Sequence, residues 1–217
     1  MPEDNKKDIL RGSIGNSFIA LIPSKVKVFI VGGGRAAFIK TKSFASRGCK
    51  VVVISKKFND KFEIFRGFSN VKFIEHEYVR DYIYEAHMVV IATNDKKLNG
   101  EIRRDCDRVN KLYMDCSEPE KGMYVMPCER DLKNFSIAVK VKGKSPKTSI
   151  YLAEKAKAYL EDYEEFADFT VKLRNKLKSD KKKKIMEFVC SDDFYFFYRM
   201  GKAELILKLF YGEGNEI

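Results

Sequence analysis

Short apolar runs alternate with polar, helix-like stretches over the first half of the chain. The first run, residues 26–31, is rich in β-branched residues and ends in three glycines, after which residues 35–47 predict a helix closed by Gly48. Residues 95–110 predict a surface helix with Thr93 or Asn94 as its N-cap. Further apolar runs predict strands at residues 51–54, 71–74, 88–92 and 111–116. Strands that alternate with helices predict an α/β fold with a parallel sheet.

The alternation stops after residue 116. Residues 123–127 and 135–141 predict two further strands, separated by a charged loop at 128–134. Beyond them the chain predicts helices, with Ser145 as N-cap and Pro146 as the first helical residue. Aromatic and aliphatic residues recur there at helical spacing, at 151–169 and 186–210, and we interpret them as core.

Composition describes a globular, basic protein. The 217 residues are 45% hydrophobic, and 42 Lys and Arg against 31 Asp and Glu give a net charge of +11. Residues 171–184 alone hold eight basic residues and one acidic residue, which fits a solvated helical face. Nucleic acid stays open as a partner for this block, but no base-stacking or helix-turn-helix pattern accompanies it, so we predict none.

Other classes of protein fit the sequence poorly. No apolar run approaches the ~20 residues that span a bilayer, so we predict no membrane partner. The N-terminus is charged where a secretory signal is apolar, and we therefore expect a reducing cytoplasm and five free cysteines. The cysteines and the two histidines lack the spacing of metal ligands, so we predict no metal site.

The clearest chemical signal is Gly32-x-Gly34-x-x-Ala37 between a predicted strand and a predicted helix. This context is typical of the Rossmann-type turn that holds the pyrophosphate of a dinucleotide with main-chain N–H groups. NAD sites usually carry an acidic residue at the end of the second strand, where this chain has Ser55, Lys56 and Lys57. A hydroxyl beside two lysines could accept a 2′-phosphate, so the pattern predicts NAD but leaves NADP open.

Four motifs, in one order and near one spacing, resemble a single family. They are VGGGRAAFIK at 31–40, VVIATNDKKLN at 89–99, DCSEPEKGMYVMP at 115–127 and GKSPKTS at 143–149. They resemble the N-terminal module of siroheme synthase, precorrin-2 dehydrogenase. The resemblance covers about residues 14 to 165 and implies NAD-dependent oxidation of precorrin-2 to sirohydrochlorin, in some members joined to ferrous-ion insertion.

The resemblance also implies an organisation of the chain. It implies an NAD(P)-binding Rossmann domain at 1–113, a small β segment at 114–150 that forms a homodimer, and a helical C-terminal domain at 151–217. By position it assigns the pyrophosphate turn to Gly32, Gly33, Gly34, Arg35 and Ala36, the adenosine-ribose loop to Ser55, Lys56 and Lys57, and the nicotinamide end to Thr93.

The family's catalytic aspartate falls on Ser117 in this chain. Residues i and i+2 of an extended segment share a face, so Asp115 can offer a carboxylate to the same side, and we predict Asp115 and Ser117 as the catalytic residues. Iron insertion depends more strongly on a placed carboxylate than hydride transfer does, so we expect chelatase activity to be weak or absent.

The substrate implied by the resemblance carries eight carboxylates, which suits a basic protein. We expect Lys142, Lys144 and Ser145, at the start of a predicted helix, to bind these carboxylates. The alternative function is a dinucleotide- or tetrapyrrole-binding module that retains the fold without the reaction.

Overall fold

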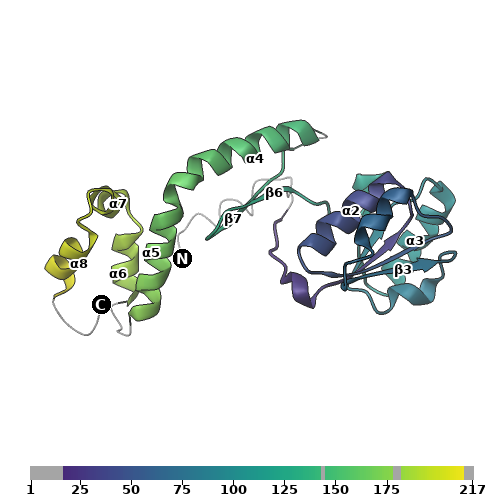
Figure 1. The fold of residues 1–217 in the computed structure, drawn as a ribbon, viewed down its shortest axis with the longest axis horizontal. Helices are drawn as coiled ribbons and strands as arrows, with labels where there is room; N and C mark the ends of the chain where they lie inside the picture. Colours follow the sequence, from purple (N-terminus) through teal and green to yellow (C-terminus); the bar gives the residue numbers. More distant parts are fainter. Residues whose placement is uncertain (1–16, 143–144, 178–181, 213–217) are drawn as a thin grey trace, which may run out of the picture. The chain divides into compact units, whose positions relative to one another are not determined.

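The chain forms two compact units, Met1–Met126 and Pro127–Ile217. The computed structural model (Figure 1) describes residues 17–142, 145–177 and 182–212. The boundary between the two units falls inside the segment 114–150, which was predicted to be one small β segment. The last strand of the parallel sheet therefore belongs to the first unit, and the antiparallel hairpin belongs to the second. The role of that segment in dimerisation stays a prediction.

A five-stranded parallel sheet is the centre of the first unit, as the alternating pattern predicted. Its order is β3-β2-β1-β4-β5. The strands are β1 (Lys27–Val31), β2 (Lys50–Ser55), β3 (Val71–Glu75), β4 (Met88–Ile91) and β5 (Leu112–Asp115). Because β2 and β3 lie on one side of β1 while β4 and β5 lie on the other, the chain reverses direction across the sheet between β1 and β4.

The central strand β1 is buried on both faces, which explains its continuous apolar run. Val28 and Ile30 pack in one core with the helix α2 (Arg35–Ser46), and Phe29 and Val31 pack in another with α3 (Lys96–Arg108). Alternate side chains of a strand point to opposite faces, so the two cores lie on opposite sides of the sheet. Burial on both faces fixes the strand and therefore the position of the glycine turn that follows it.

Among the 3₁₀ segments of the first unit, η2 (Asp60–Phe65) packs into the core of α2 and η3 (Arg80–Ile83) into the core of α3. The segment η1 (Pro23–Lys25) precedes β1, and η4 (Pro119–Lys121) follows β5. The helix α3 begins as predicted, but its N-cap is Asp95 rather than Thr93 or Asn94. Asp95 Oδ1 accepts hydrogen bonds from the N–H groups of Lys97 and Leu98, at 2.9 and 3.0 Å. The Thr93 hydroxyl therefore does not cap this helix.

The prediction of a strand at 123–127 was wrong. The N–H groups of Met123 and Tyr124 both bond to the carbonyl of Tyr113, so this segment has no ladder of its own. Tyr124 and Met126 nevertheless pack on the core of α2, which explains the apolar run. Residues 123–127 are therefore an irregular segment whose apolar side chains pack on the core beside the sheet.

The second unit begins with an antiparallel hairpin. Its strands are β6 (Cys128–Asp131) and β7 (Ser136–Val139), so β6 occupies the charged segment that was predicted to be a loop. The helix α4 (Pro146–Leu160) packs against both strands, as Figure 1 shows, and Glu154 pairs with Arg130 of β6 at 2.8 Å. This cover on one face stabilises a strand whose own sequence is polar.

Helices make up the rest of the second unit: α5 (Glu164–Lys176), α6 (Lys182–Val189), α7 (Asp192–Arg199) and α8 (Ala203–Tyr211), after the 3₁₀ turn η5 (Glu161–Tyr163). Buried residues of α5 to α8 form their common core, which is mostly aliphatic, with Phe194 fully buried and other aromatic residues packed against it. The prediction that the aromatic residues here are core was wrong for Tyr151, Tyr159, Phe196 and Phe210, which are exposed. The basic block 171–184 spans the end of α5, although residues 178–181 lie outside the described part. None of the described helices is long and apolar enough to cross a bilayer.

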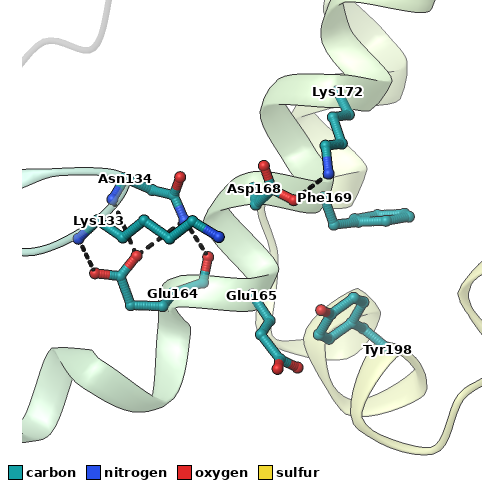
Figure 2. A pocket seen from close by; sticks show the side chains of 8 residues that line it. All are labelled: Lys133, Asn134, Glu164, Glu165, Asp168, Phe169, Lys172 and Tyr198. Carbon is teal, nitrogen blue, oxygen red and sulfur yellow. Dashed lines mark hydrogen bonds and ion pairs between the residues drawn. The ribbon is translucent and has the colours of Figure 1, made fainter.

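One carboxylate ties the hairpin to the helices of this unit (Figure 2). Glu164, the first residue of α5, accepts hydrogen bonds from the backbone N–H groups of Lys133 and Asn134 at 2.7 and 3.0 Å. The Asn134 side chain adds a bond to the same carboxylate at 2.9 Å. These residues line a small pocket of about 380 Å³, in which the carboxylate of Glu164 is already used to hold the hairpin.

Candidate functional site

A cleft of about 1020 Å³ opens at the carboxyl ends of the strands in the first unit. The loops after β1, β2, β3 and β4 line it, at the place where the order of the strands reverses. Open α/β sheets bind their ligands at such a switch point. All nine residues predicted to bind the cofactor line this cleft: Gly32, Gly33, Gly34, Arg35, Ala36, Ser55, Lys56, Lys57 and Thr93.

Contacts within the protein require glycine at two positions of the turn, Gly32 and Gly33. Gly32 has a φ of +130°, and a Cβ there would lie 2.3 Å from the carbonyl oxygen of Ala92. At Gly33 a Cβ would lie 2.1 Å from the carbonyl oxygen of Lys57. The loops after β4 and β2 therefore press against the turn, and any larger residue would push them away.

Gly34 differs, because a Cβ there would meet no protein atom within 4 Å. It lines the cleft and is the N-cap of α2, whose first N–H groups lack helical acceptors. A pyrophosphate held by those N–H groups would occupy the space that a Cβ takes away. The residues present therefore fit a dinucleotide: Gly34 with Arg35 and Ala36 would hold its phosphates.

The loop after β2 is held rigidly against the turn. The Ser55 hydroxyl donates to the carbonyl oxygen of Lys57 at 2.8 Å, and the N–H of Asn59 donates to the carbonyl oxygen of Gly33 at 3.0 Å. The Ser55 hydroxyl proton is therefore used inside the loop. Lys56, which the resemblance assigns to the ribose loop, lines the cleft.

A carboxylate that the sequence did not predict lies beside this loop. Glu77 Oε1 is 2.6 Å from Lys56 Nζ, and both residues line the cleft. Its hydrogen bond and ion pair with Lys56 lower the pKa of Glu77 below its usual range, so it is ionised at neutral pH. Because β2 and β3 are parallel neighbours with Ser55 opposite Glu75, residues that follow the two strands meet at one edge.

Thr93, at the predicted nicotinamide end, begins a chain of hydrogen bonds. Its hydroxyl donates to Asn99 Oδ1, and Asn99 Nδ2 donates to the Thr93 carbonyl oxygen at 3.2 Å. The same amide group donates to Ser117 Oγ at 3.1 Å. Asn99 is only 1% exposed, so it joins the loop after β4 to the loop after β5 from a buried position.

The two predicted catalytic residues, Asp115 and Ser117, continue this chain of hydrogen bonds. The Ser117 hydroxyl donates to Asp115 Oδ1 at 2.6 Å, and the N–H groups of Ser117 and Glu118 donate to the same oxygen at 2.9 and 3.0 Å. Arg103 pairs with the other oxygen. Asp115 is 1% exposed, so this carboxylate is buried and bonded on both oxygens.

The environment of Asp115 keeps it ionised. Burial would raise its pKa, but the hydrogen bonds from the Ser117 hydroxyl, the two backbone N–H groups and the Arg103 guanidinium outweigh burial and lower the pKa. A carboxylate with a lowered pKa is a weak proton acceptor at neutral pH. In this geometry Asp115 anchors the loop and orients the Ser117 hydroxyl.

Sequence reasoning missed Asn99 and Arg103, which complete this network from α3. A signal for Asn99 exists, since it stands three residues before the buried Ile102 and seven before the buried Cys106. A polar residue on the buried stripe of an amphipathic helix needs partners, and its partners here are the predicted Thr93 and Ser117. Glu77 has no such local signal, because only strand pairing brings it to Lys56.

The residues predicted to bind substrate belong to the second unit. Lys142 is exposed just after the hairpin, and Lys144 lies outside the described residues. Ser145 is the N-cap of α4 by position, but its hydroxyl bonds to Thr148 Oγ1 at 2.6 Å and caps no backbone N–H. Their role in binding carboxylates stays a prediction.

Comparisons with known proteins agree with the site. Residues 19–128 match a protein family described as "Putative NAD(P)-binding". The siroheme synthase of Psychrobacter arcticus is 25% identical over 191 residues, which cover 88% of this chain and 34% of that protein. The siroheme synthase of Tolumonas auensis is 24% identical over 153 residues, covering 70% of this chain and 32% of that protein. This chain therefore spans about a third of the length of these relatives.

A solved structure has the same fold over most of the chain. It is described as "SirC, precorrin-2 dehydrogenase" and matches with a TM-score of 0.67 at 18% identity, covering 89% of this chain and 98% of that one. The family match covers half of the chain and includes every residue of the cleft. The chain belongs to the family of putative NAD(P)-binding proteins, and it is similar in sequence to about a third of the length of siroheme synthases.

Proposed function

We propose that this chain oxidises precorrin-2 to sirohydrochlorin with NAD⁺, as a dehydrogenase of tetrapyrrole biosynthesis. The observation that carries the proposal is the free space at Gly34 beside the N-terminus of α2, inside a cleft lined by every predicted cofactor residue. The siroheme synthase relatives and the fold match support the substrate class.

The reaction removes a hydride and a proton from the substrate. A dinucleotide in the cleft would supply the hydride acceptor, and the proton would pass to water or to a base. The chain itself contributes binding and orientation: the turn at Gly34 holds the phosphates, and Thr93 borders the nicotinamide end. Asn99 fixes the Thr93 hydroxyl, because Asn99 Oδ1 accepts a hydrogen bond from it.

We assign Ser117 and Asp115 to the substrate side of this arrangement. The Ser117 hydroxyl, which stands where the resemblance places the family's catalytic aspartate, is oriented by Asp115 and Asn99. The carboxylate of Asp115 is bonded to Arg103 and to backbone N–H groups, which supports weak or absent iron insertion. Hydride transfer needs geometry more than a free base and is compatible with this arrangement.

The predicted partners belong to the same proposal. Precorrin-2 carries eight carboxylates, and Lys142 and Lys144 near the start of α4 would bind some of them. We propose a homodimer formed through residues 114–150. Both are inferences from the family resemblance.

Turnover of precorrin-2 tests the function directly. Purified protein with precorrin-2 and NAD⁺ is expected to form NADH, followed by its absorbance at 340 nm, together with sirohydrochlorin. Omission of precorrin-2 is the control for background reduction. Absence of turnover with both NAD⁺ and NADP⁺ would refute the enzymatic proposal.

One observation favours the alternative of a binding module without catalysis. Ser117 replaces the family's aspartate, and the neighbouring carboxylate of Asp115 is fully bonded. In that case the protein would bind the dinucleotide or the tetrapyrrole tightly and form no product. Binding measured by calorimetry beside the turnover assay separates the two functions.

Replacing Asn99 by alanine is expected to lower kcat about tenfold, equivalent to ~1.4 kcal/mol of transition-state stabilisation. The variant removes the group that orients Thr93 and Ser117. Asn70→Ala is the matched control, since Asn70 Nδ2 also bonds two carbonyl oxygens, of Ala45 and Cys49 at 2.9 and 2.8 Å, but precedes β3 and does not line the cleft. Equal losses of kcat in both variants, measured with their urea stabilities, would contradict a positioning role for Asn99.

A further inference from the structure

The choice between NAD and NADP depends on groups near the adenosine ribose. Among the described residues that line the cleft, Glu77 and Asp95 carry carboxylates. Asp95 is used as the N-cap of α3, through its hydrogen bonds to Lys97 and Leu98. Glu77 is paired with the exposed Lys56, and a ligand can engage it without removing a helix cap, so Glu77 is the better candidate of the two carboxylates.

Glu77 lies beside Lys56, in the loop that the family resemblance assigns to the adenosine ribose, and is a candidate for the ribose-binding acid although it follows another strand. NAD-binding folds usually place that acid at the end of the second strand, where this chain has Ser55 and Lys56. Here the parallel pairing of β2 with β3 brings Glu77 to the loop after β2, with Oε1 2.6 Å from Lys56 Nζ. The loop itself is fixed, because the Lys57 carbonyl oxygen lies against Gly33.

The side chains of Ser55 and Lys56, which neighbour Glu77, are already bonded within the protein. The Ser55 hydroxyl donates its proton to the Lys57 carbonyl oxygen at 2.8 Å, so it has none to offer a phosphate. Lys56, the cation that would attract a 2′-phosphate, is paired with Glu77. The side chains of Lys56 and Glu77 are 74% and 69% exposed, so a bound nucleotide can reach both.

We propose that Glu77 sets the cofactor preference of this cleft toward NAD, by accepting a hydrogen bond from the ribose 2′-hydroxyl and by neutralising Lys56. A 2′-phosphate would meet the charge of Glu77 and would have to break the ion pair with Lys56. The inference rests on the proposed function, because it concerns the same cleft and the same class of cofactor. Since both side chains are exposed to water, the discrimination is modest and depends on salt.

Titration with NADH and NADPH tests this without any turnover. The wild-type chain is expected to bind NADH more tightly than NADPH by about tenfold, the usual scale for one well-placed charge. Glu77→Gln is expected to reduce this ratio about tenfold at low salt, mainly by tighter binding of NADPH, because Lys56 becomes free. The change should shrink as ionic strength rises.

Two further variants assign the effect to the ion pair. In Glu77→Gln with Lys56→Met, the affinity for NADPH should return toward the wild-type value, because the released cation is gone. Glu63→Gln is the matched control: Glu63 is also an exposed acid paired with a cation, Arg66 at 2.5 Å, but does not line the cleft. Its ratio should equal that of the wild type.

The outcomes separate this inference from the proposed function. If the wild type binds both nucleotides and Glu77→Gln leaves their ratio unchanged, the role of Glu77 is refuted while the dinucleotide site stands. A wild type that prefers NADPH would refute it equally. If the wild type binds neither nucleotide, the proposed function fails and the inference fails with it.

Discussion

A Gly34→Ala variant is expected to stay folded and to bind NADH at least tenfold more weakly, a loss of ~1.4 kcal/mol or more. The added Cβ meets no protein atom within 4 Å, and the φ of −92° at Gly34 is accessible to alanine. Stability should therefore change by no more than about 1 kcal/mol, the scale of an altered N-cap. Only a ligand that approaches the backbone closely would meet the new methyl group.

Two other glycines provide controls for this experiment. Gly67→Ala also adds a Cβ in open space, but outside the cleft, and should alter neither binding nor stability. Gly33→Ala places a Cβ 2.1 Å from the Lys57 carbonyl oxygen, so it should lower the free energy of unfolding by about 2 kcal/mol and displace the ribose loop. Undiminished binding of NADH by Gly34→Ala, measured by nucleotide fluorescence, would show that the turn holds no pyrophosphate.

Asp115→Asn should lower the free energy of unfolding by about 3 kcal/mol, because it leaves the partly buried charge of Arg103 with only the more distant carboxylate of Glu118, at 3.5 Å. Ser117→Ala removes one hydroxyl from the same network and should cost only about 1 kcal/mol. Turnover should follow the same order, with Asp115→Asn the slower enzyme. Urea denaturation and the 340 nm assay measure the two effects, with exposed Asp60→Asn as the control.

The effect of pH gives an independent check on Asp115. Its pKa is lower in the folded chain than in the unfolded chain, so its contribution to stability is present above the usual range of a carboxyl group. The contribution is lost as the pH falls through the folded pKa. The stability difference between the wild type and Asp115→Asn should therefore narrow below about pH 4. A constant difference down to pH 3 would contradict an ionised Asp115.

Local patterns in the sequence were sufficient for the parallel sheet and the glycine turn. Apolar runs predicted the positions of β1 to β5, as burial on both faces explains for β1 and β4, although β3 is only partly buried. Patterns failed at residues 123–127 and at Cys128–Asp131 because burial there comes from packing between elements. Apolar residues of 123–127 cover the sheet without strand pairing, while polar β6 is stabilised by α4.

The sequence by itself determined the fold class, the dinucleotide turn and the family, because these depend on residues that are close together in the chain. Tertiary structure alone decided how the site is completed. Asn99 and Arg103 reach Ser117 and Asp115 across the packing of α3 on β5, and Glu77 reaches Lys56 across two parallel strands. Contacts between residues far apart in the chain follow from strand order and helix packing, which no local pattern encodes.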